Sequence, residues 1–337
     1  MTRDFYEEHP FAPYIRILGK GKKGSRSLTE QEAYDAMHMI MQGHTTPEQL
    51  GAFLMLLRVK EETHEELAGF IRAVRDTTVL ENASDDVDLD WSSYAGKRRH
   101  LPWFFLSALL LAQNGIRVFM HGAYGHTNDR LYTEELLPLF GLPKLPSLSE
   151  ARTQLQQHNF AFVALANFCP RLNDMIQLRA IMGLRSPVHT LARMINPLNA
   201  KYCFQGIFHP AYRPVHQEAA LLTGQHNLAV FKGEGGEAER NPDNDCLVQS
   251  VIDGKLEEEV WAAHFKKRHM KETPLMPEQL LNVWRGELDH EFGEAAVTAT
   301  AAVALKLLGK VDTQEAAEAL ASKMWAARDK QAYPLSS

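Results

Sequence analysis

The spacing of apolar residues changes near residue 85, and this change constrains the fold more than any other feature of the 337-residue sequence. Before it, apolar residues recur at helical spacing, and Thr46-Pro47 supplies an N-cap followed by a proline suited to the first helical turn. After it, helical stretches alternate with short apolar runs such as 160–164 and 228–231. Such alternation is typical of a largely parallel sheet covered by helices. The sequence therefore predicts a small all-α part and a larger α/β part.

Individual elements can be placed from their apolar faces and end signals. An acidic stretch, 81–90, is expected to link the two parts, with a loop over 92–100 after it. Gly115 and Gly309 each follow an apolar helical stretch, and Asp312-Thr313-Gln314-Glu315 predicts the capped start of a last helix. The expected helices cover about 30–42, 47–57, 64–76, 101–114, 295–308 and 313–327, and the expected strands cover 116–120, 160–164 and 228–231.

The overall charge gives no attraction for polyanions. Lys and Arg number 36 against 42 Asp and Glu, so the formal net charge is −6. Because charges in the cell are screened over about 8 Å, binding of a polyanion would require local clusters of Lys and Arg.

Three observations predict a cytoplasmic protein without a membrane segment. Met1–Glu8 has no apolar signal-peptide core. The longest apolar stretch, Leu101–Ala112, is shorter than the roughly 20 residues that cross a bilayer. The three cysteines are widely spaced and form neither a disulfide framework nor a CxxC metal site.

The residues around Thr46 resemble a known family. Thr46–Leu54, with Leu57-Arg58 and Glu65–Gly69 after it, is similar to the amino-terminal helices of glycosyltransferase family 3, which contains anthranilate phosphoribosyltransferase and the pyrimidine nucleoside phosphorylases. The similarity continues along nearly the whole chain, at His121-Gly122, Gly183-Leu184-Arg185-Ser186, Asn196-Pro197 and Lys232-Gly233-Glu234-Gly235.

The resemblance implies an arrangement of domains. Residues 1–80, with about 170–200, would form a small α-helical domain, and 85–168 with 201–337 a large α/β domain with a mostly parallel central sheet. The site would lie in the cleft between them, and a homodimer would form through the small domain.

Two motifs that hold the phosphoribosyl donor in this family are replaced here. The family's Gly-Thr-Gly-Gly-Asp loop lets backbone N–H groups approach the phosphates closely, and its place is taken by Ser92-Ser93-Tyr94-Ala95-Gly96. The Asn-x-Ser-Thr helix start is replaced by Pro102-Trp103-Phe104-Phe105. Between them lies the cationic run Lys97-Arg98-Arg99-His100. Both replacements predict a loss of phosphoribosyl-donor chemistry.

The acceptor site that the resemblance implies is kept only in part. His121-Gly122 is present, but the asparagine and arginine that follow it in the family have become Ala123 and Tyr124. The arginine that contacts the carboxylate of anthranilate matches Arg179, whereas its histidine partner falls on Cys169.

The magnesium-binding Asp-Glu pair of the family is also incomplete. Glu237-Ala238-Glu239 keeps Glu239 when aligned without a gap and Glu237 when one gap is allowed. A single carboxylate is a poor anchor for magnesium diphosphate. We therefore expect no cofactor, and Mg²⁺ only if the protein is an enzyme.

One branch of the superfamily shows the same departures. The YbiB-type proteins, also called the second TrpD-like family, carry a Ser-Tyr-x-Gly-x-Arg-Lys type of loop and an Arg-Ser-x-His-Thr-Leu-Ala stretch, which corresponds to Arg185–Ala192. The sequence is similar to this branch, whose members bind nucleic acid, preferentially single strands, without evident sequence choice. The resemblance implies the same role here.

The candidate site combines cations with aromatic side chains. The cationic run would neutralise phosphates at a helix N-terminus, and Tyr94 and Tyr124 would stack on bases. The residues expected at the nucleic-acid or former phosphate site are Tyr94, Lys97, Arg98, Arg99, His100, His121, Tyr124, Arg130 and Lys232. Those expected at the former acceptor site are Cys169, Arg179, Arg185, His189 and Arg193. The four basic residues among them would share part of a helical face and either line the cleft or pair with acids such as Asp174.

Less specific explanations exist for each feature. The charge run could be a solvated loop, Lys232 a turn lysine, and Trp103-Phe104-Phe105 is expected in the core. Two other functions remain open beside binding of single-stranded DNA. One is a phosphoribosyltransferase acting on an aromatic acceptor, motivated by Arg179, His121 and the remaining acid, and the other is a structural or regulatory partner protein.

Overall fold

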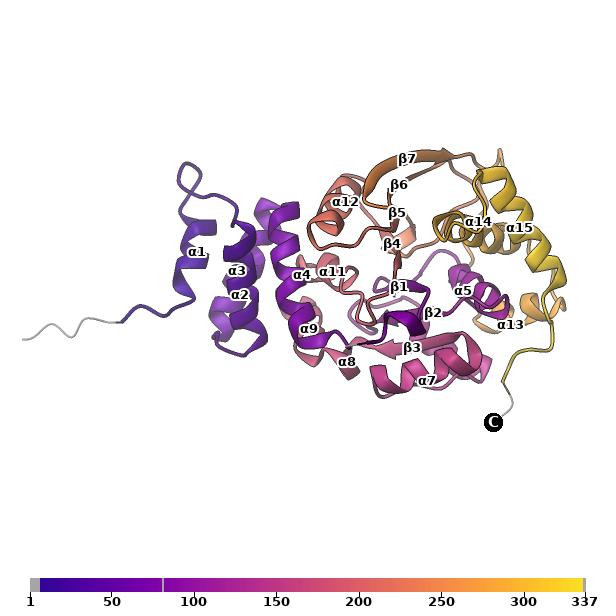
Figure 1. Ribbon diagram of the computed structural model, residues 1–337, viewed down its shortest axis with the longest axis horizontal. Coiled ribbons are helices and arrows are strands. Elements are labelled where there is room, and N and C mark those ends of the chain that lie inside the picture. The colour runs from indigo at the N-terminus through magenta and orange to yellow at the C-terminus, as the bar shows by residue number, and fades with distance from the viewer. Residues whose placement is uncertain (1–6, 81, 336–337) are drawn as a thin grey trace, which may run out of the picture.

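The computed structural model describes residues 7–80 and 82–335 of the chain. Residues 1–6, part of the stretch without a signal-peptide core, and Glu81 of the acidic stretch lie outside the described residues. Helices α1 to α4 gather at one end of the molecule, and at the other end helices surround a sheet (Figure 1). The expected combination of a small all-α part and a larger α/β part is confirmed.

Three threonines begin the helices of the first part. Thr29, Thr46 and Thr63 each accept a hydrogen bond from the backbone N–H three residues later, where a Glu or Gln bonds back to the threonine N–H. These capping boxes satisfy N–H groups that a helix end otherwise leaves without partners. The expected helices from residues 30, 47 and 64 are confirmed. The helices are α1 (Ala12–Gly19), α2 (Glu30–Met41), α3 (Pro47–Lys60) and α4 (His64–Thr78).

A seven-stranded sheet with the order β3-β2-β1-β4-β5-β6-β7 forms the centre of the second part. The strands β1 to β5 run parallel, and β6 and β7 form an antiparallel hairpin at one edge. The strand order reverses between β1 and β4, and α/β proteins bind ligands in the crevice at such a point. The strands are β1 (Leu89–Ser93), β2 (Val118–Gly122), β3 (Phe160–Ala164), β4 (Tyr202–Ile207), β5 (Leu228–Lys232), β6 (Cys246–Ile252) and β7 (Lys255–Trp261).

Both faces of the parallel strands β1 to β5 are buried, whereas most of β7 at the edge is exposed. Trp91 and Phe204 belong to an apolar cluster with α5, α13, α14 and α15, whereas Cys203 and Leu228 belong to a cluster that includes α1 to α4. Because this second cluster spans both parts of the chain, the expected domain boundaries stay a prediction.

The remaining helices are α5 (Trp103–Gln113), α6 (Thr133–Leu136), α7 (Leu148–His158), α8 (Leu165–Phe168), α9 (Pro170–Gln177), α10 (Arg179–Met182), α11 (Val188–Ala192), α12 (Tyr212–Leu222), α13 (Glu278–Arg285), α14 (Glu291–Leu307) and α15 (Gln314–Ala327), with short 3-10 turns η1 (Ser84–Asp86), η2 (Leu137–Phe140) and η3 (Glu234–Gly236).

Two expectations about short elements are corrected by the structure. The end of the acidic stretch and Ser92-Ser93 are not a linker and loop but form β1, which lies at the centre of the sheet. Because several side chains of β1 are polar, its sequence does not show the apolar pattern of a central strand. The second correction concerns the cations after residue 178, which do not share one helix. Gly183, with φ of +72°, ends α10, and α11 begins only at Val188.

Among the described residues, no helix is both long and apolar enough to cross a bilayer. Cys169, Cys203 and Cys246 are free and buried.

Candidate anion-binding cleft

The segment that follows β1 directs its backbone N–H groups toward a carboxylate from much later in the chain. Oε1 of Glu237 accepts hydrogen bonds of 2.6 Å from the N–H groups of both Ala95 and Gly96. Consecutive N–H groups of this kind form a cradle for anions. Here a side-chain carboxylate of the protein itself occupies that cradle.

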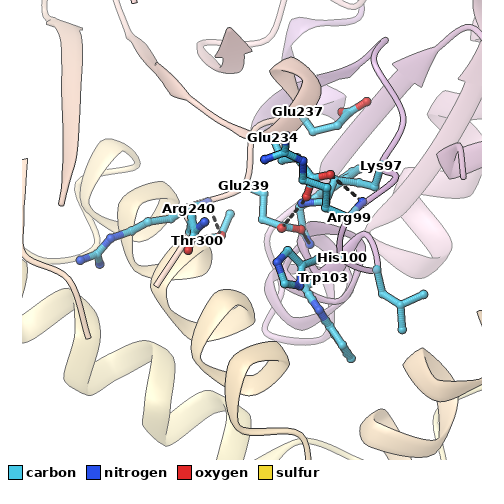
Figure 2. A network of polar contacts seen from close by, with 12 residues as sticks. Lys97, Arg99, His100, Trp103, Glu234, Glu237, Glu239, Arg240 and Thr300 are labelled. Atoms are coloured by element: carbon cyan, nitrogen blue, oxygen red, sulfur yellow. Dashed lines mark hydrogen bonds and ion pairs between the residues drawn. The ribbon is translucent and has the colours of Figure 1, made fainter. Parts of the chain in front are cut away.

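Lys97 lies inside the protein and not on the surface of the loop. Its side chain is 2% exposed, and its Nζ is 2.5 Å from Oε1 of Glu239 and 3.0 Å from Oε2 of Glu234 (Figure 2). Burial alone would lower the pKa of Lys97, but the two carboxylates outweigh burial and raise it, so the ammonium stays charged. The expected phosphate contact of Lys97 is corrected by this geometry, because its charge is already compensated by neighbouring acids.

Only two members of the cationic run face solvent. Arg98 and Arg99 are exposed, and their backbone N–H groups donate to Oε1 of Glu234 at 3.3 and 2.8 Å. His100 is buried; its ring stacks on Phe292 at 4.2 Å, and its Nδ1 lies 3.2 Å from Glu272. The cations available to a ligand on this loop are therefore the two arginines.

The two tyrosines expected to stack on bases have different environments. Tyr94 is fully buried, and its hydroxyl lies 2.7 Å from Nδ1 of His121, whose Nε2 lies 3.2 Å from Asp90. Burial raises the pKa of Tyr94 well above its ordinary value. Tyr94 and His121 are thus parts of a buried polar chain, which corrects their expected contact with a ligand. Tyr124 is 55% exposed and remains accessible.

A cavity of about 270 Å³ lies beside the loop, between the helical part and the ends of the central strands. Five of its lining side chains are arginines: Arg58, Arg130, Arg179, Arg185 and Arg193. None of them has a carboxylate within ion-pair distance among residues 7–80 and 82–335. The cavity is therefore a concentration of uncompensated positive charge on a protein that is acidic overall.

Four of the five arginines of this cavity donate hydrogen bonds to backbone carbonyl groups, and Nη1 of Arg179 also donates to the hydroxyl of Thr127. Nη1 of Arg130 donates to the carbonyl oxygens of residues 95 and 96 at 2.9 and 3.0 Å, and Nη1 of Arg179 donates to that of His126 at 2.8 Å. Arg193 donates to the carbonyl oxygen of His189. These contacts fix the guanidinium groups in place but leave their charges uncompensated.

Burial and mutual repulsion both act on these groups. Burial lowers the pKa of Arg185 to about 10, and repulsion from Arg193, Arg130 and Arg179 adds to the effect. Burial likewise lowers the pKa of His126 to about 4, so this ring is neutral at physiological pH. Since charged groups are buried together only when they are paired or bind an ion, the arrangement fits an anionic ligand.

The residues present do not fit a magnesium diphosphate. Glu237 uses one oxygen for two backbone N–H groups, and Glu239 bonds Lys97 through one oxygen and the N–H of Phe104, at 2.8 Å, through the other. Within the described part of the chain, no group of three or more His, Cys, Asp or Glu residues is arranged to hold a metal ion. Glu239 is thus engaged through both oxygens, whereas Oε2 of Glu237 is buried without a partner among the described residues, and one free carboxylate oxygen is a poor anchor for magnesium diphosphate.

The structure brings together only part of the expected site. Arg130, Arg179, Arg185, His189 and Arg193 line one cavity. Lys232 is exposed at the end of β5 but does not line the cavity, and Cys169 is buried before α9, where burial raises the pKa of its thiol to about 11.

Sequence reasoning missed several lining residues. Phe208 follows β4 and is 51% exposed at the cavity, next to His209. Its place directly after a strand at the reversal point of the sheet was a usable signal, but β4 itself was not expected. Arg58 also lines the cavity, although its sequence surroundings mark it only as part of the family resemblance.

Known proteins are similar to this chain in sequence and in fold. Residues 12–78 match the family described as "Glycosyl transferase family, helical bundle domain". An uncharacterized protein of Aquifex aeolicus is 30% identical over 237 residues, which are 70% of this chain and 72% of the relative. The uncharacterized protein YbiB of Escherichia coli is 28% identical over 244 residues, 71% of this chain and 75% of the relative. An anthranilate phosphoribosyltransferase of Oleidesulfovibrio alaskensis is 30% identical over 234 residues, 68% and 70% of the two chains.

Solved structures give the same fold. Anthranilate phosphoribosyltransferase from Thermus thermophilus superimposes with a TM-score of 0.76 over 95% of both chains at 22% identity. The enzyme from Saccharomyces cerevisiae in complex with PRPP and Mg gives a TM-score of 0.77 over 95% of this chain and 94% of that chain at 16% identity.

The chain belongs to the anthranilate phosphoribosyltransferase-like proteins of glycosyltransferase family 3. Within them it is a member of the YbiB-type branch.

Proposed function

We propose that this protein binds single-stranded DNA, without choice of sequence, in the cleft between its helical part and its sheet, and transfers no phosphoribosyl group. The observation that carries the proposal is the cavity with five arginines that have no carboxylate partner among the described residues. Arginine suits phosphate because its planar fork presents several donors at once.

The state of the loop after β1 supports the absence of donor chemistry. Its N–H groups at residues 95, 96, 98 and 99 already donate to Glu237 or Glu234. A pyrophosphate would have to displace both carboxylates, which lie in the positions an incoming anion would need.

Exposed groups extend the cavity into a longer path. Phe208 and Tyr124 are about half exposed and can stack on bases, which is independent of sequence. Arg98 and Arg99 lie outside the cavity, and the carbonyl of Arg99 accepts a hydrogen bond from the N–H of Glu272 at 2.7 Å. That bond joins the loop to a second exposed cationic segment, Lys266–Lys271.

A homodimer formed through the helical part is proposed as well. Val59 in α3 and Ile181 in α10 are 84% and 83% exposed, which is unusual for large apolar side chains that stay in water. Light scattering of the purified protein is expected to give twice the mass of the 38.1 kDa chain. A monomeric mass at micromolar concentration would contradict this part of the proposal.

The central test is a titration of a fluorescent oligonucleotide at several salt concentrations. Four phosphate contacts with a single strand would give a slope of about −3 in a plot of log K against log salt, or about a 50-fold loss of affinity between roughly 50 and 200 mM. Arg185→Ala is expected to make this slope shallower. Arg152→Ala is the matched control, because Arg152 does not line the cavity and forms an ion pair of 2.5 Å with Asp86. Absence of binding at low salt, or an affinity independent of salt, would refute the proposal.

An active phosphoribosyltransferase is the second candidate, because a relative with that name is 30% identical over 68% of this chain. Calorimetric titration with phosphoribosyl pyrophosphate and Mg²⁺ separates the two. We expect no heat of binding at millimolar donor, whereas saturable binding would favour the enzyme.

A further inference from the structure

Several buried donors of the arginine cavity have no hydrogen-bond partner among the described residues. They are Nε of Arg130, Nη2 of Arg185 and Nε of Arg193. Arg193 is only 6% exposed, so water reaches little of it. Because leaving a buried charged donor unpaired is costly, these atoms indicate where a ligand makes its contacts.

The net positive charge of the cavity is larger than the single negative charge of a phosphodiester inside a strand. Glu62 is the only acidic residue among the described residues that line the cavity, and Glu237 lies close enough to offset part of the burial effect that lowers the pKa of Arg193. Glu237 and Glu234 also act on Arg130 and oppose the effect of burial on its pKa, so five arginines face three acids and leave an excess of two positive charges. A phosphodiester inside a strand carries one negative charge, while a phosphomonoester carries about 1.5 to 2 at neutral pH.

The ring of His189 favours a ligand that can donate a hydrogen bond. Its Nδ1 lies 3.3 Å from the carbonyl oxygen of Ser186, which can only accept, so the proton of the neutral ring is on Nδ1. Burial lowers the pKa of His189 well below its ordinary value, so the ring is neutral. Its Nε2 therefore presents a lone pair inside the protein and has no partner among the described residues. A phosphodiester has no proton to donate to it, whereas the singly protonated form of a phosphomonoester has one.

The size of the cavity limits the ligand further. Its volume of about 270 Å³ lies below the roughly 300–1,000 Å³ of sites for drug-sized ligands. It has room for a phosphate with at most its own sugar, and a strand of several nucleotides would continue outside it.

We propose that this cavity binds a phosphomonoester, namely the terminal phosphate of a nucleic-acid strand, in preference to a phosphodiester from the strand interior. The strand end as its source rests on the proposed function, whereas a free mononucleotide would offer the same chemistry. The guanidinium groups of Arg185 and Arg193 contact the phosphate oxygens, and Nε2 of His189 accepts the hydrogen bond of the protonated phosphate oxygen.

The test compares fluorescent oligonucleotides of one sequence that carry a 5′-phosphate, a 3′-phosphate or two hydroxyl ends. We expect the strand with a phosphate on the preferred end to bind about tenfold more tightly than the strand with hydroxyl ends, because it gains charge-assisted hydrogen bonds. Nucleoside monophosphate and inorganic phosphate are added separately as competitors, which distinguishes a strand end from a free phosphate.

Variants locate the preference in the cavity. Arg185→Met and, as a second variant, Arg179→Met are expected to abolish the difference between phosphate and hydroxyl ends while the strand still binds through its internal phosphates. Arg152→Met removes the same charge elsewhere and is expected to keep the difference. Circular dichroism of each variant reports whether it is folded.

The outcomes separate this proposal from the function on which it rests. Equal binding of all three strands, with no competition by the monophosphate, would overturn the proposal and leave strand binding intact. Failure of every strand to bind, together with saturable binding of the monophosphate, would refute strand binding but assign the cavity to a free phosphomonoester. A preference that survives in both cavity variants would overturn the placement proposed here.

Discussion

Replacing Lys97 by methionine would remove a cation from between two buried carboxylates. Lys97 and Glu239 are each 2% exposed, and Glu234 is 18% exposed. Loss of one partner from such a buried pair costs about 3–5 kcal/mol, because the remaining charge stays desolvated and unpaired. For a domain of roughly 150–250 residues this corresponds to a fall in Tm of about 6–20 °C, at about 2–4 °C per kcal/mol.

The dependence on pH provides a second check on the same variant. Burial already raises the pKa of Glu239, and loss of the lysine charge removes the interaction that opposes burial. A carboxyl with a raised pKa in the folded state holds more protons there than when unfolded, so stability falls as pH rises through that range. The deficit of Lys97→Met is therefore expected to shrink as the pH is lowered from 8 toward 5.

Thermal unfolding followed by circular dichroism measures both effects. Lys144→Met is the control, because Lys144 is 58% exposed and its pair with Glu134 should contribute at most about 1 kcal/mol. The double variant Lys97→Met with Glu239→Gln is expected to lose less than the two single variants together. A loss no larger than that of the control would show that the buried charges are compensated in some other way.

Three further outcomes follow from the loop and the cavity. Arg98→Ala with Arg99→Ala should leave Tm unchanged and reduce the salt slope for a single strand by about 1.4, at about 0.7 per phosphate contact, as measured by fluorescence titration. Gly96→Ala should destabilise the protein by about 1–3 kcal/mol in thermal unfolding, because φ is +66° and the added Cβ would lie 2.9 Å from a tyrosine ring carbon. Affinity for a strand with hydroxyl ends should be nearly constant between pH 6 and 8 and rise only as the pH approaches 4, since burial lowers the pKa of His126 to about 4 and that of His189 well below its ordinary value.

Elements with local signals could be predicted from the sequence. The threonine caps at residues 29, 46 and 63 place three helices at their observed starts, because a capping box is complete within four residues. The strand β1 was missed, since Asp90, Ser92 and Ser93 are polar yet at most 3% exposed. Their burial depends on partners outside β1, such as His121 and Thr133, and local periodicity does not contain that information.

Some residues of the site could likewise be predicted from the sequence, and others could not. The arginines near residues 179–193 could be found because they cluster in the chain, and the structure does bring them into one cavity. The role of Lys97 could not, because its partners Glu234 and Glu239 lie about 140 residues away. A charge run has the same sequence whether its members are solvated or buried in ion pairs.

The hydrogen bonds from the loop after β1 to Glu237 also bear on how a protein of this kind changes its activity. Grafting a Gly-Thr-Gly-Gly-Asp loop into residues 92–96 would leave in place the carboxylate that bonds the N–H groups of Ala95 and Gly96. Removing the carboxylate of Glu237 alone would still leave Tyr94 and Ala95 in the loop, so neither change by itself would restore a cradle for the donor. An engineered reversal would have to exchange the loop and the 234–239 turn in a single step.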